Sequence, residues 1–303
     1  MSGNGLVALV ILGVVAPAVP GIVVKTKSLL TGRRGPPVLQ LYADLGKLFR
    51  KGTVYSRTTT WVFRAGPVVV LASLIVASLL LPLDGRAAPA RFVGDWVAFA
   101  GLLALGRFAL VLAGLDTGSS FEGMGASREV TIASFAEPTL FLCFLALVLS
   151  TGDLSLSGML GTPLAAAWPR AGASLSLVGI SLFVLLLAEN SRVPVDDPAT
   201  HLELTMIHEV IVLDHSGRDL ALILYGSALK LALFGVLVVS VFVPRAGFSG
   251  PLAVGLLFLG LGVVAVAIGL VEAVMARLRL ARVPQLLVGA AGLALFATIL
   301  QLQ

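Results

Sequence analysis

One stretch of the chain, residues 189–217, gathers acids and histidines in an otherwise apolar sequence. It reads ENSRVPVDDPATHLELTMIHEVIVLDHSG and holds all three histidines of the protein, whose residues are 58% hydrophobic. Its acids are Glu189, Asp196, Asp197, Glu203, Glu209 and Asp214, with Asp219 just beyond. Crowding of the acids should raise some carboxyl pKa values and keep some of the histidines protonated. The composition predicts a segment that relays protons.

Prolines frame the local structure predicted for this segment. Pro194 and Pro198 are expected to end the helix that carries Glu189, and Asp197 is placed to cap a new helix that begins at Pro198. Apolar residues at helical spacing continue this second helix to Asp214. We therefore predict a helix from Pro198 to Asp214 that lies at an interface.

The histidines recur every seven residues, at His201, His208 and His215. A zinc-protease motif would need a second histidine at position 212, which is Val212. We interpret the histidines as subunit contacts, and a metal site formed by His201, Glu203 and His208 stays an alternative.

Five ionisable residues, Arg107, Glu137, Glu189, Lys230 and Glu272, fall within long apolar runs. Charges at membrane depth are costly and usually face the bundle interior or a wet cavity, which favours a hydrated proton route. Static ion pairs between helices, such as Arg107 with Glu137, are the alternative. With the acidic segment, the predicted proton path comprises Glu137, Glu189, Asp196, Asp197, Glu203, Glu209, Glu272, Lys230 and Arg107.

Apolar runs long enough to cross a bilayer recur from end to end of the 303 residues. Mean hydropathy is +1.03, and only 12% of residues are charged. These values predict an all-α, polytopic membrane protein that forms one integral-membrane domain over residues 1–303. The eight expected spans are Leu6–Val24, Val62–Leu81, Phe92–Ala113, Val130–Leu149, Ser174–Ala188, Leu220–Val243, Leu252–Ala276 and Pro284–Leu302.

Arginine and lysine collect in alternate loops, above all in the basic loop of residues 25–61. The other loops on that side, which include the acidic segment's loop at residues 189–219, add Arg128, Arg192, Arg218, Arg277, Arg279 and Arg282. The positive-inside rule places these loops in the cytoplasm and both termini outside. The net charge of +5 therefore reflects membrane topology, and we expect no nucleic-acid partner.

The inside loops carry the residues expected to contact soluble partners. Leu39, Tyr42, Leu45 and Phe49 share helical spacing, which predicts an amphipathic helix along the membrane surface. The second inside loop, residues 114–130, is glycine-rich but lacks a Walker lysine and a dinucleotide fingerprint, so we expect a structured docking loop. The expected docking residues are Arg33, Arg34, Asp116, Arg128, Arg192, His201, His208, Arg277 and Arg279.

Four motifs together carry a family resemblance: GRRGPPVLQLYADLGKLFRKG, GLDTGSSFEGMGASRE, the segment 189–217 and VEAVMARLRLARVPQLL. They resemble the membrane subunit of formate hydrogenlyases and other energy-converting, group 4 nickel-iron hydrogenases, which is similar to subunit 1 of respiratory complex I. Glu189, Arg192, Pro194, Asp196 and Pro198 match the family's E-x-x-R-x-P-x-D-x-P block, with the E-L of residues 203–204 after it.

The resemblance implies a non-catalytic membrane subunit that anchors a soluble electron-transfer arm and couples it to ion translocation. Its implied partners are hydrogenase-like large and small subunits, a ferredoxin-like subunit and antiporter-like membrane subunits, in a bacterial or archaeal plasma membrane. Nickel-iron and iron-sulfur centres are implied for those partners. Cys143 is the chain's only cysteine, which agrees with clusters lying elsewhere.

Two alternatives remain at this point. A complex I-type NADH:quinone oxidoreductase subunit would contribute to a quinone site, although Asp197 and the run THLELTMIHE resemble the hydrogenase branch. An independent secondary transporter would instead form a midplane substrate site from broken helices.

Overall fold

The computed structural model describes residues 3–196, 206–245, 247–248 and 250–302. Within these ranges the regular structure is helical, with no strand. The helices are α1 (Gly3–Val15), α2 (Ala18–Leu30), α3 (Gln40–Arg50), α4 (Trp61–Ser78), α5 (Asp95–Asp116), α6 (Ser120–Thr151), α7 (Leu156–Met159), α8 (Thr162–Glu189), α9 (His208–Ile211), α10 (Gly217–Phe242), α11 (Pro251–Val274), the 3₁₀ turn η1 (Leu280–Arg282) and α12 (Val283–Leu302).

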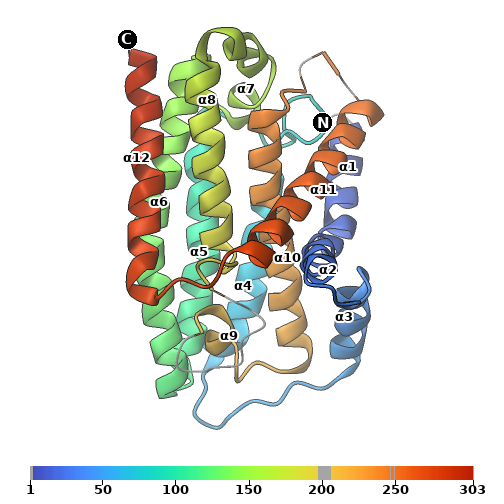
Figure 1. Ribbon diagram of the computed structural model, residues 1–303. Helices are drawn as coiled ribbons and strands as arrows, with labels where there is room; N and C mark the ends of the chain where they lie inside the picture. The colour runs from blue at the N-terminus through green and yellow to red at the C-terminus, as the bar shows by residue number, and fades with distance from the viewer. Residues whose placement is uncertain (1–2, 197–205, 246, 249, 303) are drawn as a thin grey trace.

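The long helices form one bundle of membrane-crossing length. Seven of the described helices are long and apolar enough to span a bilayer, and the bent pair α1–α2 makes an eighth span. The prediction of an all-α polytopic membrane protein with about eight spans is confirmed. In Figure 1, α5, α6, α8 and α12 stand side by side, α10 lies near the middle, and the start of α1 and the end of α12 share one end of the bundle.

The first span is broken rather than continuous. Its two halves meet at an angle of 44° around Pro17, which has no N–H to give to the carbonyl of Gly13. The Tyr225 hydroxyl from α10 donates to that carbonyl at 2.9 Å, and the Tyr42 hydroxyl from α3 donates to the carbonyl of Val14. Two tyrosines therefore satisfy backbone groups that the break would otherwise leave unpaired within the membrane.

The amphipathic helix predicted in the basic loop is confirmed as α3. Leu45 is buried, and the helix packs against α2 and α10 while Lys47 and Arg50 near its end are exposed. A basic, half-apolar helix of this kind suits the membrane surface.

The second inside loop predicted at residues 114–130 is wrong in its extent. Helix α5 runs to Asp116 and α6 begins at Ser120, so residues 117–119 alone separate them. Glu122 and Glu129 are buried inside the bundle, where they extend a helix that hydropathy alone would end. Helix α8 likewise begins well before the predicted span and bends at Ala171, just after Pro169.

The helix predicted from Pro198 to Asp214 is wrong over its described part. There only α9 is helical, while residues 197–205 lie outside the described residues. The Ile207 N–H donates to Asp196 Oδ2 at 2.9 Å, which ties the residue before α9 to the end of the preceding described segment. Ile211 packs on Gly114 and Gly125, where an added Cβ would meet its side chain at 2.9 Å. The glycines of the second loop thus admit α9 between α5 and α6.

Candidate functional site

A buried arginine on α5 lies at the centre of three glutamates. Arg107 Nη1 is 2.5 Å from Glu137 Oε1, its Nε is 3.5 Å from Glu129 Oε1, and its Nη2 pairs with Glu189 Oε2. Glu129 and Glu137 come from α6, and Glu189 ends α8. The guanidinium thus ties three helices together at membrane depth, where unpaired charge is expensive.

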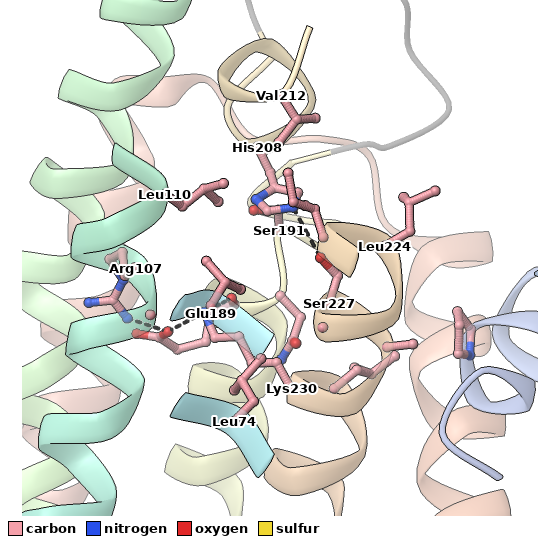
Figure 2. Close-up of a pocket in the computed structure, with 18 of the residues that line it drawn as sticks. Leu74, Arg107, Leu110, Glu189, Ser191, His208, Val212, Leu224, Ser227 and Lys230 are labelled. Atoms are coloured by element: carbon pink, nitrogen blue, oxygen red, sulfur yellow. Dashed lines mark hydrogen bonds and ion pairs between the residues drawn. The ribbon is translucent and has the colours of Figure 1, made fainter. Parts of the chain in front are cut away.

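Glu189 is shared between two cations. Lys230 on α10 places its Nζ 2.8 Å from Glu189 Oε2 and donates to the Glu189 backbone carbonyl at 2.6 Å. Figure 2 shows Arg107 and Lys230 approaching Glu189 from opposite helices. The Arg107–Glu137 ion pair, expected as the alternative to a proton route, is therefore present within a larger network that also holds Glu129, Glu189 and Lys230.

This network borders a cavity of about 370 Å³. Arg107, Glu129, Glu189 and Lys230 supply charged groups to its lining, and the apolar lining includes Leu74, Leu110 and Leu224. The acidic segment contributes Asp196, His208 and Glu209. Intramembrane charges and residues of the acidic segment therefore line the same cavity.

Glu272 belongs to a second, adjacent group of charges. Its carboxylate lies 3.5 Å from Arg192 Nη1 and 3.7 Å from Lys27 Nζ. Next to it, Arg277 Nη2 contacts Asp196 Oδ1 at 2.9 Å. Arg192 and Asp196 also line the cavity, so they connect Glu272 to the first network.

Comparison with known proteins assigns the chain to a family. The model of the NADH dehydrogenase family matches residues 4–302. The chain belongs to this family. It is 31% identical over 304 residues to formate hydrogenlyase subunit 4 of Escherichia coli K12, a match that covers 96% of each protein.

Other similarities lie on both branches of the NADH dehydrogenase family. Hydrogenase-4 component C of Escherichia coli K12 is 35% identical over 238 residues, which cover 78% of this chain and 73% of that protein. An NADH-quinone oxidoreductase subunit of Rubrobacter xylanophilus is 28% identical over 233 residues, 77% of this chain and 67% of that protein. A chain of the archaeal membrane-bound sulfane sulfur reductase has the same fold, with a TM-score of 0.83, 18% identity and 98% coverage of both chains. The resemblance seen in the sequence motifs is confirmed.

Several predicted docking residues have internal partners in this family member. Asp116 accepts the backbone N–H of Thr60 at 2.6 Å and thereby caps the start of α4. Arg128 donates to the Met206 carbonyl at 2.8 Å, and Arg192 and Arg277 hold the ion pairs given above. These four residues therefore stabilise the subunit itself, whatever else they contact.

The other predicted docking residues are exposed, half-buried or outside the described residues. Arg33, Arg34 and Arg279 are exposed. His208 is half-buried, with its Nε2 3.1 Å from Ser227 Oγ on α10 (Figure 2). Three predicted site residues, Asp197, His201 and Glu203, lie outside the described residues. The alternative metal site at His201, Glu203 and His208 lies largely with them, and no group of three potential ligands gathers among the described residues.

His215 is not one of the histidines that the crowded acids keep protonated. Its ring is 3% exposed and stacks on Phe63, with centroids 4.0 Å apart. Burial lowers the pKa of His215 below its usual value, and this outweighs the opposing effect of Asp219. His215 is therefore a neutral core residue at pH 7, and the acids near it do not make it a cation.

Glu129 is the site residue that sequence reasoning missed. It lies eight residues before Glu137 on the same helix, a spacing that places both on one face, but it had been assigned to a loop. Arg107, the ion-pair partner of Glu129, was predicted from the sequence as a site residue.

Proposed function

We propose that this protein is the membrane anchor and coupling subunit of a formate hydrogenlyase-like or group 4 hydrogenase complex. The observation that carries the proposal is the match to formate hydrogenlyase subunit 4 over 96% of both chains. Electrons pass through partner subunits, which hold the active site, and this subunit links their redox chemistry to ion movement.

The geometry supports a role in proton transfer for the two charge groups. The carboxylates of Glu129, Glu137 and Glu189 surround Arg107, and a proton taken up by one of them weakens its attraction to the guanidinium. The Arg107 guanidinium then interacts more strongly with the two remaining carboxylates and favours their charged form. Protonation of one glutamate therefore changes the proton affinity of the other two. Lys230 responds in the same way, since it shares Glu189 with Arg107.

The acidic segment is the input of this relay. Asp196 and Glu209 line the cavity, and Asp197 and Glu203 belong to the same segment, opposite the docked soluble arm in our proposal. A redox-linked charge change in that arm alters the protonation of these acids. The change in charge reaches the second group through Arg192, which lines the cavity and pairs with Glu272.

The partners and location follow from the same proposal. Soluble hydrogenase-like large and small subunits and a ferredoxin-like subunit hold the nickel-iron centre and the iron-sulfur clusters. Antiporter-like membrane subunits contact the bundle within the lipid bilayer. The complex lies in a bacterial or archaeal plasma membrane, with both termini outside and the acidic segment in the cytoplasm.

A complex I-type subunit with a quinone site is the second candidate. It is favoured by the apolar part of the cavity lining and by the similarity to the NADH-quinone oxidoreductase subunit of Rubrobacter xylanophilus. We prefer the hydrogenase branch, because the chain is 35% and 31% identical to the hydrogenase-4 and formate hydrogenlyase subunits and 28% identical to the NADH-quinone oxidoreductase subunit.

Docking of the soluble arm on the basic loop gives the first test. Changing Arg33 and Arg34 together to glutamate should lower the amount of soluble subunits that co-purify by roughly tenfold, since two attractive charges become repulsive at an interface. Insertion should persist, because Lys25, Lys27 and other cations remain in the loop. The measurement is the ratio of soluble to membrane subunits after affinity purification.

A double change of Arg86 and Arg170 to glutamate is the matched control. Both arginines are exposed, and Arg86 belongs to the linker between α4 and α5, a segment that lies at the end of the bundle away from α9 (Figure 1). The control should retain the soluble arm. Equal retention in the Arg33 and Arg34 variant would mean that the basic loop orients the protein and docks nothing.

A further inference from the structure

A second cavity lies at the end of the bundle away from α9 and has a different character. It measures about 220 Å³ and is lined by three arginines, Arg86, Arg91 and Arg245, together with Asp153 and the start of α8. Neither the family assignment nor the proposed coupling role gives it a function. Its lining is made by three parts of the chain: the linker after α4, the segment from Asp153 to the start of α8, and the residues after α10.

Arg245 is the most unusual group in this cavity. It is 4% exposed, and its guanidinium is fixed by the carbonyls of Leu83 at 2.8 Å and Pro82 at 3.0 Å and by Ser240 Oγ at 2.9 Å. Its Nε has no hydrogen-bond partner among the described residues. Burial lowers the pKa of Arg245 to about 10, so the group still carries its charge at neutral pH.

The remaining electrostatics of the cavity favour an anion. Asp153 is occupied: its carboxylate accepts the Ser155 N–H at 2.9 Å and lies 3.5 Å from Arg91 Nη2. Asp84 is the acid that acts on Arg245, but it does not line the cavity. The first turn of α8 adds the positive end of a long helix at Thr162.

The cavity is held open by backbone geometry. Gly85 adopts a positive φ of 76°, and a Cβ there would meet the Phe248 carbonyl at 2.5 Å. Gly158 packs against the Asp153 carboxylate so closely that a Cβ would lie 1.8 Å from it. Both glycines line the cavity, and the close approach at each one fixes that part of its wall.

We propose that this cavity binds a phosphate group, either that of an anionic phospholipid or free phosphate. Arg245 lines the cavity and keeps its positive charge, and an anion offsets the cost of burying that charge. Phe92 and Val93 follow Arg91 directly and are exposed. Their side chains can enter the lipid while Arg91 contacts a headgroup beside them. Arg86 is exposed at the mouth and completes the positive lining.

The test uses the purified, delipidated complex and measures binding by native mass spectrometry and by thermal shift at constant ionic strength. The probes are phosphatidylglycerol, phosphatidylcholine as the zwitterionic control, and inorganic phosphate. We expect Arg86→Gln to weaken binding of the phosphate-bearing probe by about fivefold, as loss of one exposed charge contact should. Arg170→Gln removes an exposed arginine outside the cavity and should leave binding unchanged.

The probes separate the two sources of phosphate. Binding of phosphatidylglycerol but not of inorganic phosphate identifies a headgroup, and binding of inorganic phosphate identifies the free ion. Arg245→Lys keeps the charge but removes Nε, and should weaken binding further if the variant assembles. The proposal is overturned if neither probe binds, or if Arg86→Gln and Arg170→Gln weaken binding equally, since that would be diffuse surface attraction.

Discussion

Replacing Arg107 with methionine should prevent the subunit from accumulating in a folded form. The change leaves Glu129, Glu137 and Glu189 near one another without the guanidinium that joins them. Removing one partner of a buried ion pair costs about 3–5 kcal/mol, which is a large share of the stability of an ordinary domain. The measurements are the amount of subunit in the membrane and the melting temperature of any complex that is purified.

A second change should restore part of what the first removes. Glu129→Gln, added to Arg107→Met, takes away a buried acid whose ion pair was with Arg107, so the double variant should be more stable than Arg107→Met alone. Arg57→Met is the control, because Arg57 is exposed in the linker between α3 and α4. If Arg107→Met is as stable as Arg57→Met, the network contributes nothing to the fold.

Glu189→Gln and Glu272→Gln should each abolish most proton movement while the complex still assembles. Glutamine keeps the size and the hydrogen-bonding carbonyl of the side chain, but it does not titrate, so a proton relay through it fails. Assembly should persist, because Arg107 retains two glutamates and Lys230 retains the backbone carbonyl of residue 189. We expect at least about a tenfold drop in protons moved per turnover, the size of effect typical of lost proton-transfer groups.

The measurement is acidification of inverted vesicles during turnover, normalised to the amount of complex. Asp44→Asn is the matched control. It removes an acid from α3 at the edge of the bundle, where Asp44 pairs with Lys47 and belongs to neither of the two charge groups. Electron transfer should fall as well if the two processes are tightly linked. Normal proton movement in both glutamine variants would reduce Glu189 and Glu272 to static ion-pair partners.

The sequence predicted the elements of the fold better than their ends. Apolar runs and the spacing of Leu39, Tyr42, Leu45 and Phe49 depend on local burial, so they identified the spans and α3. The start of α6 was missed because hydropathy treats a buried, paired glutamate such as Glu129 as if it faced water. The start of α8 was missed because Pro169 and Arg170 interrupt its apolar run. The length of α9 was missed because packing on Gly114 and Gly125 is a tertiary constraint.

The sequence identified most of the charged residues of the site, but it did not predict which of them contact one another. Charges within apolar runs singled out Arg107, Glu137, Glu189, Lys230 and Glu272, because such charges need partners. Their division into two groups, however, depends on contacts between distant segments, such as Arg107 with Glu189 and Arg192 with Glu272. The cavity between them also needs the three-dimensional packing of α4, α5 and α10.

The most direct test of the central claim is the reaction that the purified complex performs. The complex would be supplied with a reduced, artificial one-electron donor, and hydrogen evolution and quinone reduction would be measured with and without quinone-site inhibitors. A coupling subunit of the hydrogenase branch predicts hydrogen evolution that these inhibitors do not affect. Inhibitor-sensitive quinone reduction without hydrogen would contradict the account and assign the 370 Å³ cavity to a quinone.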